Sequence, residues 1–190
     1  MALSSRRRAR EAALQALYQM EVGKRRLSDA IADMLREADL ADDLKPFAEE
    51  LVRGVHSNQA TIDDRISAML TDWNFDRIAT VDRNIMRIAA HELYNLPTIP
   101  PAVSINEAIE IAKKYSTAES GKFINGVLGR LLLETPKAEW DPGQAEGDEE
   151  EAPPPTAEPE VVEITEESPE AKELARVGLW KVRKRKDEES

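Results

Sequence analysis

The chain has 190 residues, a formal net charge of −11 and no cysteine. This length suits one domain with a tail, and the lack of cysteine excludes disulfides and thiolate metal sites and fits a reducing cytoplasm. No apolar run approaches the roughly 18 residues that a membrane helix needs. No apolar segment follows the N-terminal arginines either, so the sequence predicts neither a membrane span nor a signal peptide.

The negative charge is concentrated in one segment. Residues 138–170 contain thirteen acidic and no basic residues, whereas residues 171–190 contain seven basic and four acidic residues. Residues 1–137 are therefore almost neutral, at −1. Because electrostatic fields are largely screened beyond roughly 8 Å at physiological salt, local charge decides the choice of partner. The acidic total does not exclude a nucleic-acid partner.

The first predicted element is an amphipathic helix over residues 4–22, which Gly23 is expected to end. Its apolar face consists of Ala9, Ala13, Leu17 and Met20. Its start carries Arg6, Arg7, Arg8 and Arg10. Cations at a helix N-terminus oppose the helix dipole at a cost of roughly a few tenths of a kcal/mol each, and no dense acidic run lies nearby in sequence. We interpret the cluster as a basic patch for phosphate and base contacts, with a solvated helix start as the alternative.

Helical spacing continues through the middle of the chain. A second helix is predicted from Ser28 to about Ala38, and a third begins near Pro46, whose missing amide suits a first turn. Asn58 is expected to open a fourth helix, unless the third and fourth are one bent helix. Thr80 is expected to cap a helix that ends where three prolines follow.

Two further helices are predicted in the segment 103–132 by two pairs of residues with capping-box spacing. The pairs are Ser104 with Glu107 and Ser116 with Glu119. Asn125-Gly126 has the composition of a hairpin turn, but the flanking apolar residues recur with a period near four, which places Gly126 inside a helix. A glycine there costs about 1 kcal/mol relative to alanine and usually lets another backbone approach closely.

No segment shows the alternation of a convincing β-strand, so the sequence predicts an all-α fold. Short loops between helices suggest a compact bundle of about seven helices, which we assign to residues 1–136. Residues 137–190 are assigned to a tail that is acidic and proline-rich and ends in a short basic segment. This tail cannot bury enough apolar surface to offset its chain entropy, so we expect it to be disordered.

The sequence contains no catalytic or metal-binding constellation. His91 and Glu92 begin like a zinc-binding H-E-x-x-H motif, but Asn95 stands where the second histidine would be. Gly121-Lys122 lacks the glycine-rich approach of a P-loop. We therefore expect no enzyme activity, no cofactor and no metal.

Three segments, taken in order, resemble one protein family. They are RRRAREAALQALYQ at the start, WNFDRIATVDRNIMRIAAHEL in the middle, and SINEAIEIAKKYS followed by KFINGVLGRL. Together they resemble the NusB family of bacterial transcription antitermination factors over most of residues 5–133. The resemblance implies two packed helical subdomains and an RNA-binding adaptor without enzymatic function. It does not extend to the tail.

The resemblance further implies that the protein binds the boxA element of ribosomal RNA leader transcripts as a heterodimer with NusE, a small-subunit ribosomal protein. The complex would join the RNA polymerase antitermination machinery. The predicted RNA-binding residues are Arg6, Arg7, Arg8, Arg10, Gln15, Glu119, Lys122, Phe123 and Asn125. The predicted NusE-binding residues are Tyr18 and Asp82, with Arg83 and Met86 as their neighbours.

Several of these residues also have a purely structural interpretation. Phe123 continues an apolar stripe, Tyr18 is typical of a core boundary, and Asp82 in a first helical turn suits the helix dipole. Glu119 would repel phosphate, so we interpret it as a residue that limits RNA affinity.

The sequence leaves two other functions open. An RNA-modifying enzyme would need a nucleotide-binding sheet, which nothing after residue 135 can form. A protein-binding helical scaffold or a homodimer would leave the arginines as solvated surface. The tail also has two interpretations, since its acidic segment can compete with RNA for the arginines and its basic end can attract RNA nonspecifically.

Overall fold

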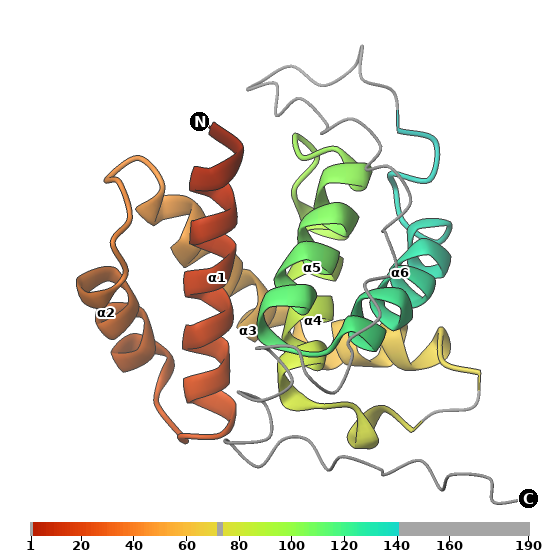
Figure 1. The fold of residues 1–190 in the computed structure, drawn as a ribbon, viewed down its shortest axis with the longest axis horizontal. Helices are drawn as coiled ribbons and strands as arrows, with labels where there is room; N and C mark the ends of the chain where they lie inside the picture. The colour runs from red at the N-terminus through yellow and green to blue at the C-terminus, as the bar shows by residue number, and fades with distance from the viewer. Residues whose placement is uncertain (1, 72–73, 141–190) are drawn as a thin grey trace, which may run out of the picture. The chain divides into compact units, whose positions relative to one another are not determined.

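The computed structural model describes residues 2–71 and 74–140, and every regular element in these ranges is helical (Figure 1). The elements are α1 (Ala2–Glu21), α2 (Leu27–Glu37), α3 (Lys45–Ala68), the 3₁₀ turn η1 (Phe75–Arg77), α4 (Thr80–Asn95), α5 (Pro101–Tyr115) and α6 (Ala118–Leu132). The all-α prediction is confirmed. The described ranges hold six α-helices and one 3₁₀ turn where the sequence predicts about seven helices.

The predicted third and fourth helices are one continuous helix, α3, which is 24 residues long. Asn58 lies inside α3 and does not open a new helix. Its side-chain amide donates a hydrogen bond to the carbonyl of Gly54, 2.9 Å away. Pro46 lies in the first turn of α3, as predicted. The buried apolar face of α3 continues on both sides of Asn58, which explains why the helix does not break there.

The capping predictions for the last two helices are wrong in detail. α5 begins at Pro101. A proline suits the first turn of a helix because the amide donor that it lacks would have no partner there. Ser104 therefore lies inside the helix. Glu107 consequently does not cap the helix and instead binds an arginine of α1. The N-cap of α6 is Thr117, one residue later than predicted, and its hydroxyl accepts a hydrogen bond from the Ser120 amide at 3.1 Å.

The central helix of the fold is α4. It packs against α1, α3, α5 and α6, and 11 of its 16 residues are buried. The helices α1, α2 and α3 contact one another, and α5 and α6 pair with each other and with α4 (Figure 1). Because α4 contacts helices of both sets, the six described helices pack around it as one unit.

The folded unit continues past α6 and beyond the predicted domain limit at residue 136. Lys137 is only 5 % exposed, and its ammonium donates to the carbonyls of Glu92, Leu96 and Ile99 at 2.8, 2.5 and 2.5 Å. Glu92 lies in the last turn of α4, and Leu96 and Ile99 lie just past its end, so Lys137 ties the segment after α6 to the C-terminal end of α4. The predicted disordered tail lies outside the described residues from residue 141 onward.

A glycine and a histidine allow α3 and α4 to approach closely. A methyl group on Gly54 would lie 2.1 Å from ring atoms of His91, a residue that is 2 % exposed. Burial lowers the pKa of His91, and its Nδ1 lies 3.0 Å from the side-chain amide of Asn95. A methyl group on Gly126 would meet nothing within 4 Å, so the close approach predicted at Gly126 is wrong.

We expect Gly54→Ala to lower the free energy of unfolding by about 1–3 kcal/mol, because the added methyl group overlaps the His91 ring and forces α3 and α4 apart. Gly126→Ala is the matched control and should raise this free energy by about 1 kcal/mol, since alanine is the better helix former. Urea denaturation measures both variants. Unchanged or higher stability of Gly54→Ala would contradict the close approach.

We expect Lys137→Met to lower the free energy of unfolding by roughly 1–3 kcal/mol, because three carbonyls at and just past the end of α4 each lose a hydrogen bond. Burial lowers the pKa of Lys137 to about 8, whereas it stays near 10.4 in the unfolded chain. The unfolded chain therefore binds more protons between these values, and the advantage of wild type over the variant should grow as the pH rises from about 8 to about 10.

Lys113→Met is the control for this measurement, because Lys113 is exposed and, within residues 2–71 and 74–140, pairs only with Glu110 of its own helix. Its stability should differ from wild type by no more than about 0.5 kcal/mol at any of these pH values. A Lys137 variant that behaves like the Lys113 variant would show that the end of α4 does not depend on the Lys137 side chain.

Candidate nucleic-acid and partner interface

Three of the four arginines at the start of α1 reach the surface, and two of them, Arg6 and Arg8, are not held by a buried carboxylate in any contact described below. The side chain of Arg8 is 54 % exposed and lies 2.9 Å from Asp39, whose own side chain is 95 % exposed. Arg6 is half-buried, and its guanidinium lies 5.4 Å from the centre of the Phe47 ring. Exposed ion pairs contribute only about 0–1 kcal/mol, so a phosphate can replace Asp39 as the partner of Arg8 at little cost.

A third arginine, Arg7, joins α1 to α5. Its Nε and Nη2 donate to the two carboxylate oxygens of Glu107, each at 2.7 Å. Glu107 is 1 % exposed, and its hydrogen bond with Arg7 raises the pKa of the arginine. If Arg7 left for a phosphate, the buried carboxylate would lose its partner, which is strongly destabilising. Arg7 therefore holds two helices together even though 37 % of its side chain is exposed.

The fourth arginine, Arg10, lies inside the protein. It is 1 % exposed, and its Nε donates to a carboxylate oxygen of Glu92 at 2.7 Å. Glu92 is fully buried, and the Phe47 ring covers the guanidinium at 5.4 Å. A side chain enclosed in this way offers no surface to a phosphate. The RNA contact predicted for Arg10 is therefore corrected to a structural role.

A polar seam between α1 and α5 leads toward the start of α6. Glu11 accepts hydrogen bonds from the ammonium of Lys114 at 2.9 Å and from the hydroxyl of Tyr115 at 3.2 Å. These two residues end α5, and α6 begins shortly afterwards, at Ala118. Gln15 lies one turn beyond Glu11 on α1 and is exposed. These hydrogen bonds hold the middle of α1 against the end of α5, a few residues before α6 begins.

The first turns of α6 present polar side chains to solvent. Glu119, Lys122 and Asn125 are exposed, whereas Phe123 is half-buried and packs against the core. Lys113 and Lys114 on α5 have carboxylate partners, but Lys122 has no ion pair with any residue in the described ranges. Lys122 is therefore available for a phosphate, and Phe123 is better placed for packing than for stacking on a base.

The predicted partner-binding residues differ in exposure. Tyr18 is 41 % exposed. Asp82 is 7 % exposed and accepts a hydrogen bond from the Ser120 hydroxyl at 2.8 Å, so it links α4 to α6. Met86 is fully buried. A side chain in the core cannot contact a partner, so the role predicted for Met86 is corrected to core packing.

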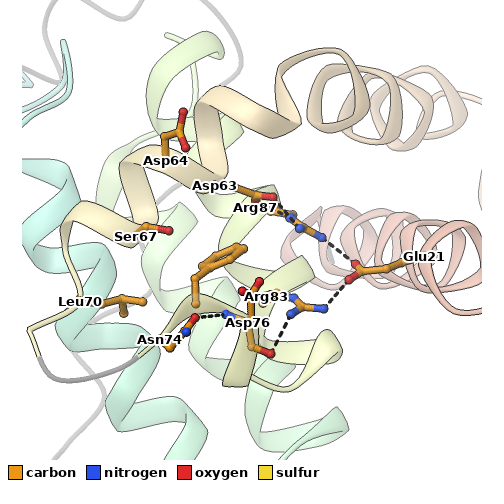
Figure 2. A pocket seen from close by; sticks show the side chains of 10 residues that line it. Glu21, Asp63, Asp64, Ser67, Leu70, Asn74, Asp76, Arg83 and Arg87 are labelled. Carbon is orange, nitrogen blue, oxygen red and sulfur yellow. Dashed lines mark hydrogen bonds and ion pairs between the residues drawn. The ribbon is translucent and has the colours of Figure 1, made fainter.

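Arg83 belongs to a charged network that no pattern in the sequence predicted (Figure 2). Glu21 at the end of α1 accepts hydrogen bonds from Arg83 and Arg87 of α4, at 2.5 and 2.7 Å. Arg87 also donates to both carboxylate oxygens of Asp63 on α3, each at 2.7 Å. Burial alone would raise the pKa of Glu21, but the hydrogen bonds from Arg87 and Arg83 outweigh burial and hold the pKa below its usual value. The network joins three helices beside Tyr18.

The described residues contain no group of three or more His, Asp or Glu side chains that could hold a metal ion. None of the helices seen in this part of the chain combines the length and the apolar composition that crossing a bilayer requires.

Comparison with known sequences identifies the family to which the chain is similar. A family model described as the NusB family matches residues 7–132. The transcription antitermination protein NusB of Anaeromyxobacter sp. (strain Fw109-5) is 44 % identical over 132 residues, which cover 69 % of this chain and 92 % of the relative. The NusB protein of Pelotomaculum thermopropionicum is 45 % identical over 128 residues, or 67 % of this chain and 89 % of that protein. The matched region spans nearly the whole length of these relatives.

Solved structures share the fold. NusB of T. maritima matches with a TM-score of 0.66 and 41 % identity, covering 70 % of this chain and 94 % of that structure. A crystal structure of the antitermination factors NusB and NusE in complex with double-stranded RNA contains a chain that matches with a TM-score of 0.63 and 26 % identity. That match covers 69 % of this chain and 98 % of the other.

We expect Arg10→Met to lower the free energy of unfolding by about 3–5 kcal/mol, because the carboxylate of Glu92 stays buried without its partner. Arg8→Met, which removes an arginine of the same helix from an exposed pair, should change this free energy by no more than about 1 kcal/mol. Thermal and urea unfolding followed by circular dichroism compare the two variants. Equally small effects would show that Arg10 is not structural.

Proposed function

The chain belongs to the NusB family, and on that premise we propose that it is a transcription antitermination factor that binds RNA and catalyses no reaction. The observation that carries this proposal is the family match over residues 7–132. Relatives that are 44 % and 45 % identical bear the name of the antitermination protein NusB, and the chain spans most of their length.

The proposed target is the boxA element of ribosomal RNA leader transcripts. Sequence-specific proteins mostly read RNA in its single-stranded form, where unpaired bases are accessible. The structural relative is described as a complex with double-stranded RNA, so the form of RNA that this chain prefers is part of the proposal and of its test. Binding to the nascent transcript would favour elongation through terminators in ribosomal RNA operons.

We assign the RNA contacts to the exposed members of the predicted set. Arg6, Arg8 and Lys122 would attract phosphates, because charge-assisted contacts to the RNA backbone supply most of the nonspecific affinity. Gln15 and Asn125 are exposed amides that can donate to and accept from base edges. Arg7 would hold α1 against α5 through Glu107, and Phe123 would hold α6 in place by packing against the core. Glu119 would limit affinity because it lies one turn before Lys122.

The proposed protein partner is NusE. In the structural relative NusB is in complex with NusE, and Tyr18 supplies an exposed aromatic ring on this chain. Asp82 and Arg83 would shape the same surface through their contacts with Ser120 and Glu21. The partner would extend the RNA-binding surface and bring the complex to RNA polymerase. A factor of this kind acts where transcription occurs, so we place it in the cytoplasm.

A protein-binding scaffold or homodimer is the second candidate function. It is favoured by one observation, namely that buried carboxylates already hold Arg7 and Arg10. This reduces the basic patch to fewer available cations than the sequence suggests. The two candidates differ in their response to RNA and to salt.

We expect the full-length protein to bind a boxA-like RNA, more tightly with NusE than without it, and with an affinity that falls steeply between about 50 and 200 mM salt. The triple variant Arg6→Ala/Arg8→Ala/Lys122→Ala should bind more weakly. Because each phosphate contact to a single strand contributes about 0.7 to the salt slope, that slope should fall by about 2. Fluorescence anisotropy with single-stranded and duplex forms of the RNA measures both quantities.

One control and one further variant accompany the RNA measurement. Arg36→Ala/Arg53→Ala removes two exposed cations from α2 and α3 and should leave RNA affinity unchanged. Glu119→Asn should tighten binding, since it removes repulsion of the phosphates. Absence of RNA binding both with and without NusE would exclude the RNA adaptor and leave the scaffold.

A further inference from the structure

The segment that follows α6 is attached to the central helix. The ammonium of Lys137 donates to the carbonyl of Glu92 at 2.8 Å, and the carboxylate of the same glutamate accepts a hydrogen bond from Nε of Arg10 at 2.7 Å. Glu92 therefore contacts both α1 and the residue from which the tail continues. In Figure 1 the start of α1 and the segment after α6 both lie in the upper part of the view.

These contacts place the beginning of the tail close to the exposed arginines of α1. The guanidiniums of Arg6 and Arg10 each lie 5.4 Å from the centre of the Phe47 ring, so they are no more than twice that distance apart. Continued through Glu92, whose side chain extends about 5 Å, this chain of contacts puts Arg6 within roughly 25 Å of the Lys137 ammonium. The exposed Arg8 lies on the same turn of α1.

The tail carries its densest negative charge within reach of these arginines. Residues 138–151 contain seven acidic and no basic residues, and four of the seven are consecutive. We call these four the acidic run; they are Asp148, Glu149, Glu150 and Glu151. The run begins eleven positions after Lys137, and eleven residues span up to about 36 Å. The connecting chain is therefore long enough for the run to reach Arg6 and Arg8.

Arg8 can accept a further carboxylate. Its partner in the described residues is Asp39, and the two side chains are 54 % and 95 % exposed, so the pair is solvated and weak. A run of four carboxylates attracts a guanidinium more strongly than one carboxylate does, because their charges add within the screening length. Arg7 and Arg10 are already held by buried carboxylates, which leaves Arg6 and Arg8 as the arginines of α1 for the run.

The covalent connection makes this contact favourable. Exposed pairs of arginine and carboxylate are too weak to hold separate molecules together. When both groups belong to one chain, the length of the connecting segment sets the effective concentration of one group at the other, and short segments give roughly millimolar values. RNA phosphates would then have to displace carboxylates that are always nearby.

We propose that the acidic run binds Arg6 and Arg8 and competes with RNA for them, so that the tail lowers the affinity of the chain's own RNA-binding surface. This inference rests on the proposed function, because RNA is the ligand that the run displaces. The competition lowers the affinity of every RNA that uses these arginines by the same factor. Weakly bound RNA is therefore released first, whereas RNA that NusE and base contacts also hold stays bound.

The test compares the full-length protein with a variant in which the acidic run is replaced by the matching amides, Asp148→Asn/Glu149→Gln/Glu150→Gln/Glu151→Gln. At low salt this variant should bind a boxA-like RNA roughly three- to tenfold more tightly than wild type does, because RNA no longer displaces two exposed ion pairs. The difference should shrink as salt is raised, since the pairs are screened. Fluorescence anisotropy measures the affinities, and melting temperatures should be the same for both proteins.

A matched control removes four charges further along the tail, through Glu158→Gln/Glu160→Gln/Glu166→Gln/Glu167→Gln. Effective concentration falls as the connecting segment lengthens, so this control should change RNA affinity by less than about twofold. A second control places the amides of the acidic run in the Arg6→Ala/Arg8→Ala protein, where they should have no effect. Equal tightening by the two sets of amides, or a full effect without the two arginines, would show that net charge acts at a distance and would overturn the contact.

A measurement without RNA separates this inference from the proposed function. In NMR spectra of the RNA-free full-length protein, the amides of the acidic run should shift the Nε–Hε signals of Arg6 and Arg8 and leave that of the buried Arg10 in place. Unchanged signals of Arg6 and Arg8 would overturn the inference even where RNA binds. They are also the result expected if the run pairs with residues 171–190, which hold seven basic and four acidic residues. If none of the proteins binds RNA, the proposed function fails and the competition fails with it, whereas shifted arginine signals would still support the contact.

Discussion

The buried carboxylate of Glu92 is the constraint on which the rest of the structure depends. It lies in the central helix with no exposure to solvent, where an ionised group without a partner would be very costly. Arg10 supplies the compensating charge from α1, and the backbone carbonyl of the same glutamate accepts a hydrogen bond from Lys137. One residue thus ties the first helix and the segment after the last helix to the centre of the fold.

This arrangement divides the arginines of α1 into two kinds. Arg10 and Arg7 are held by Glu92 and Glu107, which are buried, so neither arginine can leave without stranding a charge. Both pairs fix the helix in place. Arg6 and Arg8 lie further out, and we propose that they meet the RNA on a helix whose position the other two have already set. Such preorganisation lowers the cost of ordering the surface on binding.

Sequence periodicity was sufficient to predict the helices, because each helix depends on an apolar face formed by residues that are close together in the chain. It was not sufficient for the charges, because Arg10 and Glu92 are 82 positions apart and meet only through tertiary packing. A signal was nevertheless present: each residue shares the buried face of its helix with apolar neighbours, which is typical of a buried pair. The prediction for Glu107 was wrong for the opposite reason. Its spacing from Ser104 is that of a local capping box, but the helix begins earlier, at Pro101, and needs no cap at Ser104.

The central claim is that the α1 arginines have distinct roles, and NMR of the arginine Nε–Hε groups tests it most directly. RNA is titrated into the labelled full-length protein in the presence of NusE. The account predicts that the Nε–Hε signals of Arg6 and Arg8 shift, while those of Arg7 and Arg10, whose Nε atoms bind carboxylates at 2.7 Å, keep their positions. Shifts of Arg7 and Arg10 as large as those of Arg6 and Arg8 would contradict it.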